Sequence, residues 1–190
     1  MNIKGSKVEN VNDKILGNIQ WFIAHEAAHF WLGQSLNYKK QGDTWFTEGG
    51  ANFAAVSVVS AAGSNFNVDK ERLKYVDACR KDAMKGSIVS AQERQDFDIY
   101  YNCGALFHMT ANKLAQNKNM DWFAFIKKLI AAQSKTDSAL STKEWLAELR
   151  NIGASKTIIS DMQNIYDGKE GREASVNRLA KYVGLSENKI

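Results

Sequence analysis

The sequence has no proline and only two cysteines among its 190 residues. Without proline, chain reversals depend on glycine and asparagine, which is compatible with a helix-rich domain. Cys79 and Cys103 do not amount to a disulfide framework, and they do not form a Cys-x-x-Cys pair. Whether they pair, and in which redox compartment the protein works, both stay open at this point.

The sequence also lacks long apolar runs and blocks of like charge. No apolar run approaches the roughly 20 residues that span a bilayer, so we expect no transmembrane segment in this chain. The first residues lack the basic head and apolar stretch of a secretory signal, and the compartment is left undetermined. The net charge is +4, but lysine and arginine are spread along the chain, so we expect no nucleic-acid partner.

What the chain does contain is a composition of 44% apolar and 24% charged residues, typical of a soluble globular protein. Its length suits a single domain over residues 1–190. Hydrophobic periodicity predicts a mainly α fold without a convincing strand.

Helix boundaries follow from periodicity and capping residues. Apolar residues at three- and four-residue steps predict a first helix from about Asn12 to Gly33, and a second runs from Trp45 to Ala62. Asn67 is suited to cap a third helix over residues 68–85, which Gly86 ends. Further helices are predicted over residues 100–116, from Asp121 through Ile130, after a capping box at 141–144, over 157–166 and over 172–183, with a long connection at 87–98.

Two of the three histidines lie four residues apart, in the segment His25-Glu26-Ala27-Ala28-His29. Residues four apart share one face of a helix, so both imidazoles can reach a single metal ion, and we expect both to face inward. Glu26 lies about 100° around the helix axis from His25, near the metal without binding it. From there it can take a proton from a metal-bound water, as in metallopeptidases with this spacing.

A further glutamate, Glu48, falls in the first turn of the second predicted helix. A carboxylate there suits the positive end of the helix dipole and would face the first helix if the two helices pack antiparallel. Two histidines and one glutamate form a ligand set of catalytic zinc, which leaves a fourth position open. We therefore predict one zinc per chain, held by His25, His29 and Glu48. The alternative is that both histidines are ordinary polar residues of a half-buried helix, and the complete motif argues against it.

The spacing around the motif selects among zinc peptidases. A metzincin needs a third histidine six residues after the second, and that position is Ser35. Instead, HEAAHFWLG at 25–33 and WFTEGGANF at 45–53 resemble the signature of the alanyl-aminopeptidase family of gluzincins, H-E-x-x-H-x-W-x-G followed by W-x-x-E-G-x-A. The resemblance implies a zinc aminopeptidase that acts on peptides or proteins. It also implies the fold of the helical lobe of a thermolysin-like catalytic domain.

A second segment, Tyr101-Asn102-Cys103-Gly104, resembles the Y-x-K-G segment of the same family. The resemblance gives Tyr101 the role of donating a hydrogen bond to the oxyanion of the tetrahedral intermediate. Cys103 departs from the usual lysine, and a simple packing role for Tyr101 stays open. The family also implies a preceding β-rich lobe of the same protein as a partner, so we expect this chain to be a fragment of a longer one.

Residues near the motif have competing interpretations. Asn52 lies four residues after Glu48 and is suited to orient an imidazole, or it is an ordinary capped asparagine. For His108, a place in the core is favoured over an approach to the site. Three aromatic residues flank the ligands in sequence, namely Trp31, Trp45 and Phe53. The family resemblance implies that they are walls of the zinc pocket, but core packing explains them equally well and is the expectation that we favour.

Three classes of function are compatible with these motifs. The first is a zinc peptidase of the aminopeptidase type. The second is a zinc-binding interaction domain without hydrolytic activity, against which the intact Glu26 argues, because a binding module does not need a general base. The third is a gluzincin hydrolase that acts on a non-peptide bond, which the sequence does not separate from the first.

Overall fold

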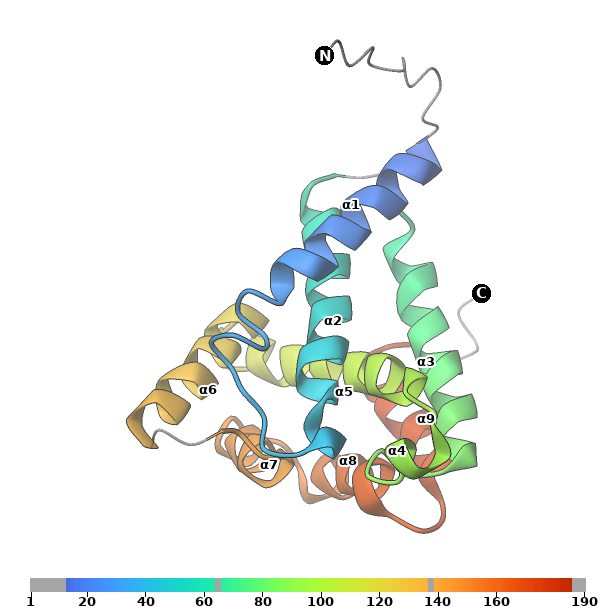
Figure 1. The fold of residues 1–190 in the computed structure, drawn as a ribbon, viewed down its shortest axis with the longest axis vertical. Helices are drawn as coiled ribbons and strands as arrows, with labels where there is room; N and C mark the ends of the chain where they lie inside the picture. Colours follow the sequence, from blue (N-terminus) through green and yellow to red (C-terminus); the bar gives the residue numbers. More distant parts are fainter. Residues whose placement is uncertain (1–12, 64–65, 137–138, 186–190) are drawn as a thin grey trace, which may run out of the picture.

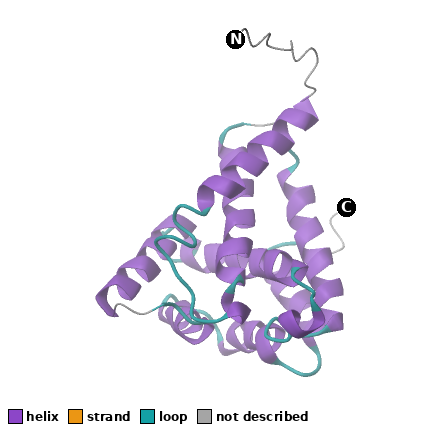
Figure 2. Cartoon of the chain, viewed as in Figure 1, coloured by secondary structure: helices purple, strands orange, loops and turns teal. Residues whose placement is uncertain are grey.

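The computed structural model describes residues 13–63, 66–136 and 139–185. Within these ranges the regular elements are helices and no strand is present, as Figures 1 and 2 show. The predicted mainly α fold is therefore confirmed. In chain order the elements are α1 (Asp13–Ala28), η1 (Gln41–Asp43), α2 (Trp45–Ala61), α3 (Val68–Lys85), α4 (Ala91–Arg94), α5 (Asp98–Gln116), α6 (Trp122–Thr136), α7 (Thr142–Asn151), α8 (Lys156–Asp167) and α9 (Arg172–Tyr182).

Both predicted helix caps are present. The Asn67 side chain accepts a hydrogen bond from the Lys70 amide at 2.9 Å and begins α3. Ser141 and Glu144 form the reciprocal capping box at the start of α7. The connection predicted at 87–98 contains the short helix α4, which is too brief to leave a hydrophobic period in the sequence.

The first helix ends earlier than predicted. Asn12 lies outside the described residues, and α1 ends at Ala28 instead of continuing to Gly33. Beyond that point the turns tighten, because the His29 amide bonds to the Glu26 carbonyl, three residues back, at 3.2 Å. Gly33, with φ of 122°, then carries the chain out of the helical direction.

Helix α5 is the central element of the fold. It crosses behind α2 in Figure 1, and α3 packs along it as well. The crossing of α2 and α5 is unusually close, because a Cβ built on Gly49 would lie 2.2 Å from the Gly104 carbonyl carbon. A Cβ on Gly104 would in turn lie 2.7 Å from the Trp45 carbonyl oxygen. The two backbones are therefore in direct contact, which only glycine allows at both positions.

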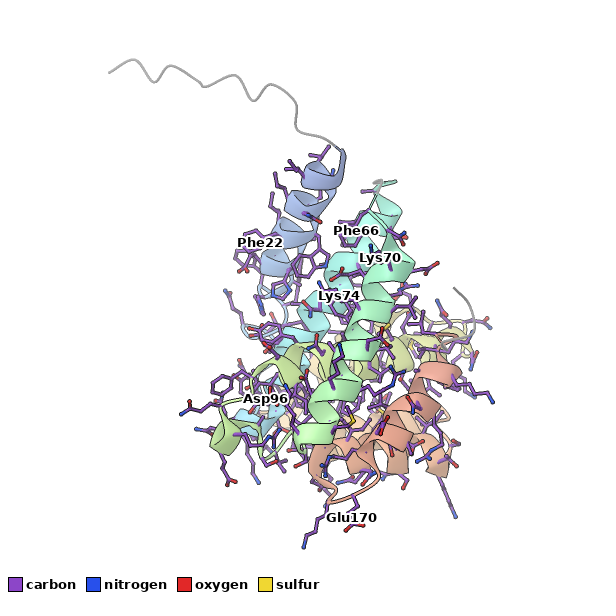
Figure 3. The ribbon with its side chains drawn as sticks, turned by 90° about the vertical axis from the view of Figure 1, so that its right-hand side faces the viewer. Phe22, Phe66, Lys70, Lys74, Asp96 and Glu170 are labelled. Atoms are coloured by element: carbon purple, nitrogen blue, oxygen red, sulfur yellow. A yellow bond between two sulfur atoms is a disulfide. The ribbon has the colours of Figure 1, made fainter. Side chains whose placement is uncertain are left out.

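Helix α1 packs mainly against α2, and most of its apolar residues face solvent. Phe22 and Ile23 are 57% and 61% exposed, and Figure 3 shows Phe22 on the outer side of the helix. The same exposed side carries Ile15, Leu16, Ile19 and Phe30. The periodicity thus identified a helix correctly, although its apolar stripe is not part of the core.

The expectation for the three flanking aromatic residues holds for two of them. Trp45 and Phe53 are buried in the core, whereas Trp31 is 60% exposed, so its predicted place in the core is wrong. Trp31 follows the end of α1 and lines an open apolar hollow together with Ala54 and Val58 of α2, so its ring is not covered. Within the described ranges, no helix combines the length and the apolar character that a membrane crossing requires.

The connection between α1 and α2 is fixed by buried Asp43. Its carboxylate accepts hydrogen bonds from the Thr142 hydroxyl at 2.6 Å and from the Tyr166 hydroxyl at 2.9 Å. Trp45, at the start of α2, donates its indole N–H to the same Thr142 hydroxyl at 3.1 Å. These contacts hold the first turn of α2, which carries Glu48, against the C-terminal helices.

Candidate metal centre

Three side chains converge between the end of α1 and the first turn of α2. The Nε2 atoms of His25 and His29 lie 3.3 Å apart. The Oε2 atom of Glu48 lies 3.8 Å from the first of these nitrogens and 3.5 Å from the second. All three candidate ligand atoms lie within 4.8 Å of one another.

These separations fit a tetrahedral metal ion. Nitrogen and oxygen ligands at the usual 2.0–2.2 Å from tetrahedral zinc are about 3.3–3.6 Å from each other. The distances of 3.3, 3.5 and 3.8 Å are close to that range. Among the described residues, the cluster contains three histidine or acidic groups and no cysteine, which leaves one tetrahedral position open.

The imidazole of His29 is oriented by the turn that follows α1. Its Nδ1 atom lies 3.3 Å from the Leu32 carbonyl oxygen, an acceptor for an N–H group. With the proton on Nδ1, the Nε2 lone pair is directed at the cluster, as in zinc proteins whose histidine bonds a backbone carbonyl. Although His29 was expected to face inward, its side chain is 30% exposed, and it forms the open side of the cluster.

His25 lies deeper, between two aromatic rings. Its ring centroid is 5.3 Å from that of Trp21 and 6.3 Å from that of Tyr101. Burial is the main cause that lowers the pKa of His25, and the nearby His29 adds to the effect. The charges of Glu48 and Glu26 act in the opposite direction. The net result favours the neutral imidazole, which is the form that binds a metal.

Glu26 and Tyr101, the two other predicted site residues, lie beside the cluster. Glu26 is exposed, and its charge contributes to raising the pKa of both His25 and Tyr101. Burial is the main cause that raises the pKa of Tyr101, followed by the charge of Glu48 and a hydrogen bond to its carboxylate. Tyr101, in the first turn of α5, is therefore near enough to Glu48 for the charge of that carboxylate to act on its pKa.

Asn52 and His108 have different relations to this site. Asn52 is buried, donates a long hydrogen bond of 3.5 Å to the Tyr101 carbonyl, and is among the groups that raise the pKa of His25. His108 lies in the core, as expected, where its Nε2–H bonds the Phe46 carbonyl at 3.1 Å. Its Nδ1 accepts from the Trp122 indole at 2.9 Å, and burial lowers its pKa to about 3.

The structure also joins the two cysteines, whose pairing the sequence left open. Cys79 of α3 and Cys103 of α5 form a disulfide across a sequence separation of 24 residues. Sequence reasoning also did not foresee the backbone contact between Gly49 and Gly104, which brings the helix of Tyr101 against the helix of Glu48. In the sequence, this contact is marked only by the two glycines themselves, one directly after Glu48 and one three residues after Tyr101.

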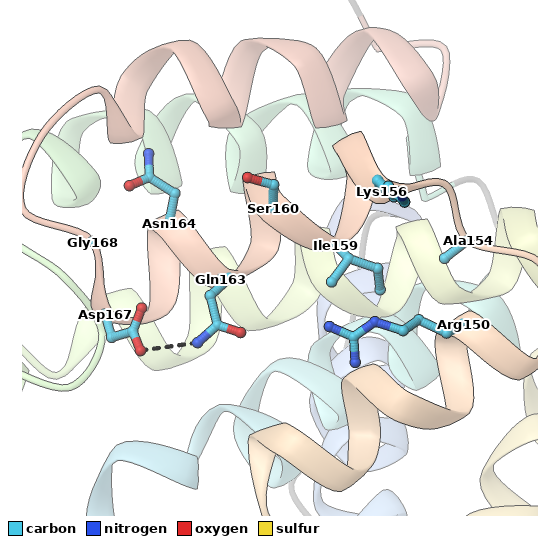
Figure 4. A pocket seen from close by; sticks show the side chains of 9 residues that line it. All are labelled: Arg150, Ala154, Lys156, Ile159, Ser160, Gln163, Asn164, Asp167 and Gly168. Atoms are coloured by element: carbon cyan, nitrogen blue, oxygen red, sulfur yellow. Dashed lines mark hydrogen bonds between the residues drawn. The ribbon is translucent and has the colours of Figure 1, made fainter.

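Open space adjoins the cluster. His29 and Glu48 line a hollow of about 490 Å³, together with Gln34, Asn37 and Tyr38. Another hollow, of about 690 Å³, lies along α7 and α8 and is drawn in Figure 4. Two of its polar side chains, Gln163 and Asp167, bond each other at 2.9 Å, and it shares no residue with the cluster. The hollow beside His29 is therefore the one that the candidate ligands can serve.

A comparison with models of protein families matches residues 6–166 to the peptidase family M1 domain. The matched range includes all three candidate ligands as well as Glu26 and Tyr101. No curated protein and no solved structure matches the chain.

Proposed function

This chain belongs to the M1 peptidase family, and we propose that it is a zinc-dependent peptidase of the aminopeptidase type. The observation that carries the proposal is the convergence of two imidazoles and one carboxylate at tetrahedral spacing. Family membership supports a peptidase, and this ligand set supports zinc as its metal. The aminopeptidase type rests on the resemblance of the segments 25–33 and 45–53.

In this proposal His25, His29 and Glu48 hold the metal. Zinc, when bound there, supplies a Lewis acid that polarises the scissile carbonyl and increases the acidity of water. The hollow beside His29 and Glu48 gives a peptide access to the open side of the cluster. Burial favours the neutral imidazole of His25, which is the form that binds a metal, and Glu48 is held in the first turn of α2.

Glu26 acts as the general base. Its carboxylate is exposed and is near enough to His25 and Tyr101 to influence the pKa of both. It accepts a proton from the attacking water and then passes that proton to the leaving amine, which must be protonated to depart. Because Glu26 is not in the ligand cluster, its carboxylate stays free for both transfers.

Tyr101 stabilises the oxyanion that forms when water adds to the carbonyl. A phenol with the ordinary pKa of about 10 is protonated at neutral pH, and burial raises the pKa of Tyr101 further, so its hydroxyl can donate a hydrogen bond. The ring of Tyr101 lies 6.3 Å from that of the ligand His25, centroid to centroid, which supports a place for its hydroxyl near a substrate oxygen at the metal.

The first experiment is zinc analysis of the purified protein beside two histidine variants, followed by hydrolysis of amino-acid arylamides. We expect about one zinc per chain in the wild type and a loss of both zinc and activity in His25→Ala. His108→Gln is the matched control, because His108 lies outside the cluster, and it should keep its zinc. A folded wild type without zinc would contradict the proposal.

A second variant separates the base from the ligands. Glu26→Gln should retain zinc and lose turnover by about 10²–10⁴-fold, the usual contribution of a general base. Glu173→Gln makes the same chemical change at an exposed position of α9 and should be silent. Full activity in Glu26→Gln would refute the mechanism. Zinc without turnover in the wild type would favour a binding domain or a non-peptide substrate.

A further inference from the structure

One face of α3 packs against α5, the helix that carries Tyr101. Tyr75, Cys79 and Asp82 recur at steps of four and three residues, which places them on the same side of the helix. All three are buried. The Tyr75 ring is part of the hydrophobic core. Cys79 and Asp82 are directed at the beginning of α5.

Two contacts from this face hold the beginning of α5. The disulfide joins Cys79 to Cys103, which is two residues after Tyr101. Asn102, which lies between Tyr101 and Cys103 in the sequence, donates a hydrogen bond from its side chain to the Asp82 carboxylate at 2.9 Å. Residues 102 and 103 are thus tied to α3 by one covalent bond and one charge-assisted hydrogen bond.

Tyr101 itself has little packing of its own. Its residue is 36% exposed, and it meets the site through the ring of His25 and the carboxylate of Glu48. Its place over the cluster therefore depends on where the backbone of residues 101–104 is held. A displacement of about 1 Å in a positioning element can lower the rate of an enzyme by about 10²-fold.

We propose that the Cys79–Cys103 disulfide, together with the Asp82–Asn102 hydrogen bond, is a positioning element that fixes the Tyr101 hydroxyl relative to the metal ligands. The inference rests on the proposed function, because it concerns the role given there to Tyr101. It assigns no contact with substrate to the cysteines, which are fully buried. The candidate ligands come from α1 and α2, so loss of the disulfide should leave the affinity for zinc intact while turnover falls.

The test is a double-mutant cycle in the full chain. Cys79→Ala/Cys103→Ala and Tyr101→Phe are made separately and together, and kcat, KM and zinc affinity are measured. We expect the loss of the disulfide to lower kcat by about 10- to 100-fold. We expect KM and zinc affinity to stay within about twofold of the wild type. Tyr101→Phe should lower kcat by about 10²-fold in the wild type and by less than about tenfold without the disulfide.

A second readout does not depend on catalysis. In the metal-free proteins, hydrogen exchange of the amides at 98–104 should be faster in the disulfide-free variant than in the wild type. The control for general destabilisation is Leu179→Ala, which removes buried atoms in α9. That variant should keep its kcat and the full effect of Tyr101→Phe. If the disulfide-free variant does not fold, Asn102→Ala removes only the hydrogen bond and should give the same pattern with a smaller amplitude.

The outcomes separate this inference from the proposed function. An equal effect of Tyr101→Phe with and without the disulfide would overturn the inference, because Tyr101 would then act independently of its tie to α3. Unchanged hydrogen exchange at 98–104 would overturn it as well, even for a protein without turnover. A wild type that lacks zinc or turnover refutes the proposed function instead, and the exchange measurement then decides the inference alone.

Discussion

Helices α1 and α5 both pack against α2, but they are held there in very different ways. Helix α5 is buried over most of its length, is linked to α3 by a disulfide, and touches the backbone of α2 through Gly49 and Gly104. Helix α1 contributes the candidate ligand His25 and leads into the turn that carries His29, yet an apolar stripe of this helix faces solvent. The candidate metal centre therefore joins a closely packed part of the molecule to a helix with one apolar side exposed.

The site residues therefore come from elements that are held to different degrees. Glu48 and Tyr101 belong to the closely packed pair α2 and α5, whose relative position is fixed by backbone contact. His25 and His29 come from α1 and the turn after it, whose contacts with the rest of the protein are fewer. A metal bound by both groups would add to α1 the attachment that its exposed side chains do not provide.

The largest effect on the free energy of unfolding is expected from zinc binding. It would make α1 more nearly as well held as α5. At about a thousandfold excess over its dissociation constant, a ligand that binds only the folded state adds about 4 kcal/mol to the free energy of unfolding. Hydrogen exchange should show the new protection in α1, with little change in α5. His25→Ala is the control and should show neither effect. Protection that appears only in α5 would contradict the assignment of the ligands to α1.

The next largest effect is expected at the crossing of α2 and α5. In Gly104→Ala the new Cβ would lie 2.7 Å from the Trp45 carbonyl oxygen and 2.9 Å from the Gly49 Cα, both backbone atoms. Because neither can move without shifting a helix, we expect the free energy of unfolding to fall by about 3 kcal/mol. Urea unfolding measures this loss. A loss below about 1 kcal/mol would show that the helices are not in contact there.

A pH dependence should follow from the buried histidine of α5. Burial lowers the pKa of His108 to about 3 in the folded state, compared with about 6.5 in the unfolded chain. Between these values the unfolded state binds more protons, so the stability that His108 contributes falls as the pH falls below about 6.5. At pH 4.5 the loss from this residue is on the order of 2–3 kcal/mol.

The control for this prediction is His108→Gln, compared with the wild type at pH 7 and pH 4.5. Carboxylates that titrate in this range affect both proteins equally, so the difference between the two losses isolates His108. Equal losses of stability in both proteins would mean that His108 is not held neutral by burial.

The smallest effect is expected on the exposed stripe of α1. Ile23 is 61% exposed, so Ile23→Ala should change the free energy of unfolding by no more than about 0.5 kcal/mol. The matched variant Ile99→Ala, at a fully buried position of α5, should cost about 2–5 kcal/mol. Equal costs would remove the contrast between the two helices, and thermal or urea unfolding measures both.

Much of the fold could be predicted because the sequence marks helix ends clearly. Asn67 and Ser141 are capping residues that act over three residues, and such local signals do not depend on the rest of the molecule. The end of α1 was misplaced because the tightening after Ala28 leaves the apolar pattern unchanged. Periodicity also shows that a helix has an apolar side without showing what covers it, which is why the exposure of Phe22 and Trp31 was not foreseen.

The sequence was enough to name the residues of the candidate ligand cluster. It was not enough to predict the helix packing and the disulfide that surround this cluster. The spacing of His25 and His29 fixes their common face, because helix geometry alone determines it. Their approach to Glu48, and the position of Tyr101 beside it, depend on how α2 meets α1 and α5, which is a property of the folded chain. The same holds for the disulfide, since two cysteines 24 residues apart give no local sign of pairing.

The contact between Gly49 and Gly104 also limits which amino-acid substitutions this protein tolerates. Each of the other nineteen amino acids has a Cβ, so every substitution at either position meets backbone atoms of the opposite helix. The separation between the helix of Glu48 and the helix of Tyr101 is therefore insensitive to most side-chain variation and highly sensitive at two positions. A complete mutational scan would find two intolerant glycines inside a neighbourhood where other residues can be exchanged more freely.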